Sequence, residues 1–209
     1  MLPQEIEIKL DLQTEENYNR LIKRFKITEK PTRQENYFFD SEHMDLSKSG
    51  WAFRLRIEEN KSSFALKGKT TKSSGGLAIR DEVEVLIPDE TAKKYAENGF
   101  RGVIIPDEIL QIIKPIVNPK DLTQRLFFVN DRYRVEFTGG DIDLLFEIDK
   151  TEYADGSINY ELEVELEDHL FYQEALGGIT AFLNSVEIVT VFQKHGKFAR
   201  ALKRENLAN

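Results

Sequence analysis

The stretch EIEIK at residues 5–9 decides how the chain is interpreted. Glu5, Glu7 and Lys9 alternate there with Ile6 and Ile8. Because successive side chains of a strand point to opposite faces, one face carries only charges and the other only aliphatic groups. The charged face either lies in water or lines an interior, and the remaining strands favour one of these two interpretations.

The same alternation returns along the chain. Charged residues occupy alternate positions in RLRIE, ALKGK, IRDEVE, RYRVE, FEID and ELEVELE, within the ranges 51–59, 62–70, 77–87, 131–138, 141–150 and 158–167. A sheet with one solvated face is common, and ion pairs across its strands contribute about 0.2–1 kcal/mol each. Two features disfavour it here. The polar faces hold few Thr, Ser or Gln, and same-sign acids follow one another about 6.6–6.8 Å apart.

A closed barrel with charges inside and aliphatic groups outside removes this conflict. Helices would cover the outer face, while the interior would hold basic groups for a polyanion and carboxylates for a divalent cation. Carboxylates without neighbouring His or Cys favour Mg²⁺ or Mn²⁺ over Zn²⁺. Basic side chains combined with such a cation can hold and cleave phosphate chains. The fold class is therefore α+β, with about eight strands that are antiparallel where the turns can be identified.

Helices are expected around and after these strands. One is predicted at 14–26 behind Thr14 as N-cap, and two lie in an insertion at about 88–120, each with Pro near its first position. The C-terminal helices span about 168–206, namely one at 168–184 with a break near Gly177–Gly178 and one at about 190–206. Further strands are predicted at 4–12, 34–40 and 122–130, and a loop at 71–76. No linker divides the chain, so we expect a single domain over residues 1–209.

Composition limits the partners. The net charge of −8, from 29 basic and 37 acidic residues, argues against nucleic-acid or anionic-membrane partners. The absence of cysteine excludes disulfides, thiolate zinc sites and cysteine nucleophiles. Without a secretory-type N-terminus or a membrane-length apolar run, the expectation is a cytoplasmic protein. A homodimer is left open.

Six motifs follow one another along the chain in a fixed order: ExExK, RLR, LKG, RDEVE, a late Asp and ELE. This ordered series resembles that of the CYTH domain, also called the triphosphate tunnel metalloenzymes. The resemblance spans about residues 4–167. It implies an eight-stranded antiparallel β-barrel that forms a tunnel, with helices outside and at the C-terminus. It also implies a small-molecule triphosphate as ligand, hydrolysed in most members with a divalent metal.

Matched position by position, the resemblance implies roles for individual residues. The set that grips phosphate and supports catalysis is Lys9, Arg54, Arg56, Lys67, Arg80 and Arg125, and Arg134 is added for substrate binding. The implied ligands for Mg²⁺ or Mn²⁺ are Glu5, Glu7, Glu82, Glu84, Asp149, Glu161 and Glu163. Glu165 replaces Glu161 if the register shifts by two residues.

Three functions remain open at this stage. The leading one is hydrolysis of inorganic triphosphate or of an organic triphosphate such as thiamine triphosphate. The second is a class IV adenylyl cyclase, which the same family contains, although no motif here is assigned to base recognition. The third is a module that binds polyphosphate or a nucleotide without turnover.

The basic tail QKHGKFARALKRE at residues 193–205 also has two interpretations. The simpler one is a solvated helix whose cations lie favourably near its C-terminus. The alternative is a helix at one tunnel mouth that contributes Lys197 or Arg200 to substrate entry.

Overall fold

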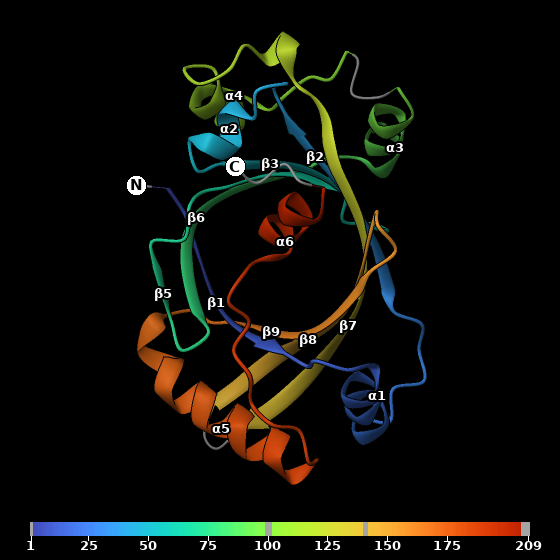
Figure 1. Cartoon of the computed structure of the whole chain (residues 1–209), viewed down its shortest axis with the longest axis vertical. Helices are drawn as coiled ribbons and strands as arrows, with labels where there is room; N and C mark the ends of the chain where they lie inside the picture. Colours follow the sequence, from blue (N-terminus) through green and yellow to red (C-terminus); the bar gives the residue numbers. More distant parts are fainter. Residues whose placement is uncertain (1, 99–101, 140–141, 206–209) are drawn as a thin grey trace.

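The computed structural model describes residues 2–98, 102–139 and 142–205. Eight antiparallel strands close into a barrel, shown as a ring in Figure 1. Around the ring they are β1 (Gln4–Asp11), β9 (Ile158–Glu165), β8 (Ile142–Tyr153), β7 (Thr123–Gly139), β2 (Thr32–Asp40), β3 (Ala52–Ile57), β4 (Ser63–Lys67) and β6 (Leu77–Leu86). Pairing of β6 with β1 closes the ring. The predicted α+β barrel is confirmed.

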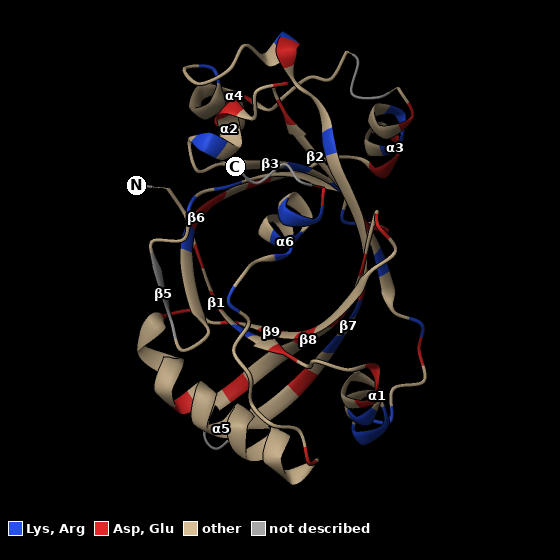
Figure 2. Cartoon of the chain, viewed as in Figure 1, with Lys and Arg blue, Asp and Glu red and all other residues tan. Residues whose placement is uncertain are grey.

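The strand register places the charged faces inside the barrel. Glu5 pairs with Arg80 where β1 meets β6, and Lys9 pairs with Glu163 where β1 meets β9. Since side chains alternate along a strand, Ile8 points to the outer side, where it is fully buried. Figure 2 shows acidic and basic residues along the strands of the ring. The charged face of the opening stretch therefore lines an interior.

Helices cover the outer face of the barrel on two opposite sides (Figure 1). On one side, α1 (Glu15–Arg24) and α5 (Tyr172–Ser185) complete a core that contains Phe146 and Leu162. On the other, α2 (Asp45–Lys48), α3 (Asp89–Glu97) and α4 (Asp107–Ile113) complete a core around Phe53 and Phe64. The predicted N-cap is confirmed, because the Asn17 amide donates to Thr14 Oγ1. None of the described helices is long and apolar enough to cross a membrane.

Three elements differ from the predicted ones. The stretches 122–130 and 131–138 form a single strand, β7, and a short strand β5 (Lys72–Ser74) occupies the predicted loop. Helix α5 continues through Gly177 and Gly178. A Cβ on Gly178 would lie 3.0 Å from Cα of Gly139 in β7, so glycine allows a close helix–strand approach there. The predicted strand start at 141 and helix end at 206 fall outside the described residues.

The C-terminal helix α6 (Lys197–Arg204) lies at one end of the barrel lumen, within the ring of Figure 1. It begins later than predicted because the preceding chain is extended beside β1, where the Gln193 amide donates to the Lys9 carbonyl. Phe198 of α6 packs on the inward-facing Phe38, with ring centroids 4.9 Å apart. The prediction of a solvated helix is therefore wrong.

Candidate active site

The barrel encloses a cavity of about 790 Å³. It is lined by predicted site residues from six strands, namely Glu5, Glu7, Lys9, Arg54, Arg56, Lys67, Arg80, Glu82, Glu84, Arg134 and Glu163. The predicted ligands Asp149 and Glu161 are fully buried and bind Lys197, which does line the cavity. The structure thus brings together all predicted site residues except Arg125.

The first carboxylates, Glu5 and Glu7 on β1, are held by cations. Lys67 Nζ lies 2.7 Å from Glu5 Oε1, and Arg80 Nε lies 2.5 Å from Glu5 Oε2. Burial alone would raise the pKa of Glu5, but Lys67 and Arg80 lower it far below its usual value. Glu7 contacts Arg80 Nη2 at 2.7 Å and Lys9 Nζ at 2.8 Å, yet burial raises its pKa.

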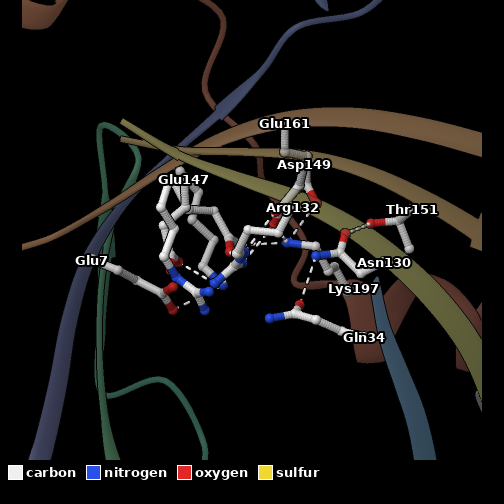
Figure 3. A network of polar contacts seen from close by, with 12 residues as sticks. Glu7, Gln34, Asn130, Arg132, Glu147, Asp149, Thr151, Glu161 and Lys197 are labelled. Atoms are coloured by element: carbon white, nitrogen blue, oxygen red, sulfur yellow. Dashed lines mark hydrogen bonds and ion pairs between the residues drawn. The ribbon is translucent and has the colours of Figure 1, made fainter. Parts of the chain in front are cut away.

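A second cluster of carboxylates comes from β8 and β9 and surrounds Arg132 and Lys197 (Figure 3). Arg132 donates from Nε and Nη2 to the two oxygens of Asp149 at 2.7 and 2.6 Å, and from Nη2 to Glu163 at 2.7 Å. Burial would raise the pKa of Asp149, but Arg132 and Lys197 more than offset this and lower it. The Asp149 carboxylate therefore remains ionised inside the barrel.

The arginine pair on β3 is much less neutralised. Arg54 has Glu84 as its carboxylate neighbour at 3.9 Å, and its buried Nε finds no hydrogen-bond partner in the described chain. Arg56 Nε donates to the neutral Asn36 Oδ1 at 3.1 Å. Burial and the nearby charges of Arg54 and Arg132 lower the pKa of Arg56 to about 9. This direction indicates too little negative charge beside the pair, so an anion bound here would be stabilised.

Arg125 does not line the cavity among the described residues. It lies at a bulge in β7, where Phe38 pairs with Leu126 but Phe39 pairs with Gln124. Its charge acts instead on Glu205, just beyond α6. The bulge interrupts the regular alternation of side chains along β7, and matching the motifs of the sequence position by position could not reveal it. The predicted phosphate-gripping role of Arg125 is thus not supported by this geometry.

The structure also separates the two alternatives for the last acidic position. Glu161 is fully buried, and Arg200 Nη1 and Nη2 contact its oxygens at 2.9 and 2.5 Å. Glu165 lines the cavity but is an exposed residue. Glu161 and Glu163, not Glu165, converge with Asp149 on one cation.

Several site residues were not assigned a role from the sequence. Arg132 and Glu147 lie on charged faces that the alternation had revealed, so that signal could have included them. Glu58 accepts hydrogen bonds from Arg134 Nη1 at 2.9 Å and from Gln34 Nε2 at 2.7 Å. A buried series of hydrogen bonds between neutral side chains continues from Gln34 through Asn130 to Thr151 (Figure 3). Because these side chains are uncharged, the alternation of charges in the sequence could not predict it.

The donor set fits a hard divalent cation. Asp149, Glu161 and Glu163 supply only oxygen and converge on the Lys197 ammonium, and all-oxygen ligands are the chemistry that Mg²⁺ and Mn²⁺ prefer. Within the described ranges, no three or more His, Asp or Glu side chains form a ready metal site. The carboxylates are instead engaged by lysine and arginine, so an ion would have to replace such contacts.

Comparisons with known proteins agree with this geometry. The family description that matches is the CYTH domain, over residues 3–188. A Hippeastrum protein described as an adenylyl cyclase candidate with a dominant triphosphatase activity is 25% identical, with a TM-score of 0.80, covering 97% of this chain and 96% of that one.

Two further structures share the fold. A candidate adenylate cyclase from Bacillus halodurans is 22% identical, with a TM-score of 0.70 over 94% of this chain and 97% of that one. The protein PH1819 from Pyrococcus horikoshii OT3 is 15% identical, with a TM-score of 0.57 over 95% and 99%. No curated protein sequence matches the chain. Because the family match covers residues 3–188 and the chain forms the charged barrel described above, the chain belongs to the CYTH domain family.

Proposed function

We propose that the protein hydrolyses a triphosphate inside the barrel with the help of Mg²⁺ or Mn²⁺. The substrate is inorganic triphosphate or an organic one such as thiamine triphosphate. The observation that carries this proposal is the arginine pair Arg54–Arg56, whose positive charge is poorly neutralised within the lumen. Planar guanidinium groups suit bidentate contacts with phosphate oxygens. The triphosphatase activity described for the Hippeastrum relative supports it.

The remaining cations extend the phosphate path along the cavity. Lys9, Lys67 and Arg80 line it and are paired with carboxylates, while Arg134 is paired with Glu58 and Glu147. A bound triphosphate would give these groups phosphate oxygens in place of some carboxylate contacts. Because the donors are fixed on barrel strands, they stabilise charge without reorganising during the reaction.

The acidic residues supply the second half of the chemistry. We assign Glu5, Glu7, Glu82, Glu84, Asp149, Glu161 and Glu163 as the carboxylates that would hold the divalent ion. When bound, this ion would neutralise charge that develops on the phosphoryl oxygens. Water attacks a terminal phosphorus, the bond from that phosphorus to the bridging oxygen breaks, and a carboxylate orients the water and receives its proton. Inorganic triphosphate then yields phosphate and pyrophosphate.

One assay tests this function. The protein is incubated with inorganic triphosphate, thiamine triphosphate and ATP, with and without Mg²⁺ or Mn²⁺, and phosphate, pyrophosphate and cyclic AMP are measured. We expect metal-dependent phosphate release that Glu163→Gln abolishes and Arg125→Gln leaves within twofold. Cyclic AMP with pyrophosphate would identify a cyclase, and tight triphosphate binding without turnover would identify a binding module. Either result would refute the proposed hydrolysis.

A further inference from the structure

The Lys197 ammonium lies at the meeting point of three carboxylates. Its Nζ is 2.8 Å from Asp149, 3.1 Å from Glu161 and 2.7 Å from Glu163. The Lys197 side chain is 12% exposed, and Asp149 and Glu161 are not exposed at all. A lysine ammonium is positively charged at neutral pH, and here three carboxylates lie within ion-pair distance of it.

An ammonium group has three N–H donors, and the three carboxylates can take all of them. Carboxylate oxygens bind Mg²⁺ at about 2.0–2.1 Å, closer than any of these contacts. A divalent ion held by the same oxygens would therefore lie within a few ångströms of the ammonium. Two cations so close in a buried site repel each other strongly. The ion and the Lys197 head group cannot share this position.

We propose that Lys197 is a tethered stand-in for the divalent ion. In the metal-free protein it holds Asp149, Glu161 and Glu163 together, and metal binding displaces it. This inference rests on the proposed metal-dependent function, and it assigns a positioning role to a residue of the C-terminal helix. Metal affinity is then set by competition with a lysine of the same chain.

The surrounding contacts determine what can move when Lys197 leaves. Lys197 is the first residue of α6, and one turn later Arg200 holds Glu161 and donates to the Tyr153 hydroxyl at 2.9 Å. Phe198 remains packed on Phe38. The helix is thus anchored by side chains other than Lys197, so displacement should loosen its first turn while α6 stays at the barrel end.

The direct test is Mn²⁺ affinity without substrate at pH 8, by electron paramagnetic resonance, for wild type, Lys197→Met and Lys203→Met. Lys203 is an exposed residue of the same helix and serves as the matched control. Because Mn²⁺ no longer displaces a charge-assisted contact, we expect Lys197→Met to bind it about 10- to 100-fold more tightly. Lys203→Met should stay within twofold of wild type.

The outcomes separate this inference from the proposed function. Equal or weaker Mn²⁺ binding by Lys197→Met, with wild type still binding the ion, would overturn the stand-in role and leave metal-dependent hydrolysis intact. No Mn²⁺ binding by either protein would overturn both.

A second measurement uses wild type alone and so does not depend on how the variant folds. Amide hydrogen exchange of a peptide covering residues 196–204 should become faster when Mn²⁺ is added, since the first turn loses its anchor. Unchanged or slower exchange in the Mn²⁺-bound protein would contradict the displacement of Lys197.

Discussion

The substitution Arg132→Gln tests the electrostatic core of the barrel. The Arg132 side chain is 7% exposed and contacts Glu147, Asp149 and Glu163. Glutamine removes the charge and leaves the fully buried Asp149 with Lys197 as its remaining cation. Breaking a buried ion pair by removing one partner costs about 3–5 kcal/mol. We expect the free energy of unfolding to fall by this amount at pH 8, measured by urea denaturation without metal.

The pH dependence of this loss has a definite sign. In wild type the pKa of Asp149 is lowered, so its stabilising contribution is present above the unfolded value of about 3.9 and is lost as pH falls through the folded value. In Arg132→Gln the desolvation of Asp149 is less offset, and its folded pKa rises. Protonation then relieves the buried charge. The difference in stability between variant and wild type should therefore shrink between pH 8 and pH 5.

Arg33→Gln is the matched control, because the Arg33 side chain is 61% exposed and lies 3.8 Å from Asp131. Surface ion pairs contribute about 0–1 kcal/mol, so this variant should lose no more than that. A loss of stability in Arg132→Gln as small as that in Arg33→Gln, or a deficit that grows on acidification, would show that Arg132 does not stabilise the buried carboxylates.

Two further predictions concern the arginine pair and α5. Arg54→Gln and Arg56→Gln should each raise the KM for inorganic triphosphate about 10- to 100-fold, since a charged hydrogen bond contributes about 1.5–3 kcal/mol. Arg125→Gln should change this KM less than twofold. Steady-state kinetics that give the same KM for all three variants would contradict the assignment. Gly177→Ala should stabilise the protein by about 0.5–1 kcal/mol through helix propensity, because its Cβ meets nothing within 4 Å. Gly178→Ala should destabilise it by about 1–3 kcal/mol through its contact with β7, and a gain in melting temperature for both would disprove the close approach.

The barrel could be predicted because its decisive signal is local. Alternation of charge and aliphatic groups is a property of each strand, and it correctly placed Glu5, Arg54 and Glu163 inside. The ion pairs could not be predicted, because they depend on which strands become neighbours. Glu5, for example, meets Lys67 and Arg80 only when the barrel closes.

Two differences between the structure and the sequence-based expectations share a physical origin in nonlocal packing. The bulge at Arg125 removes that residue from the lining, and it is set by the pairing of β7 with β2. The position of α6 depends on inward-facing Phe38 and Phe128, which provide an apolar surface at one end of an otherwise charged lumen. An amphipathic pattern shows that one face of a helix is buried, but it does not show against what. The sequence of the tail therefore fits a helix inside the lumen as well as a helix on the outer face of the barrel.

The proposed function requires the poorly neutralised arginine pair to bind the triphosphate within the barrel. A crystal structure with inorganic triphosphate and Mn²⁺, using an inactive Glu163→Gln variant if turnover is fast, tests it most directly. We expect phosphate oxygens within hydrogen-bond distance of Arg54 and Arg56, inside the cavity. Triphosphate bound outside the barrel, or bound in the lumen without contact to either arginine, would contradict it.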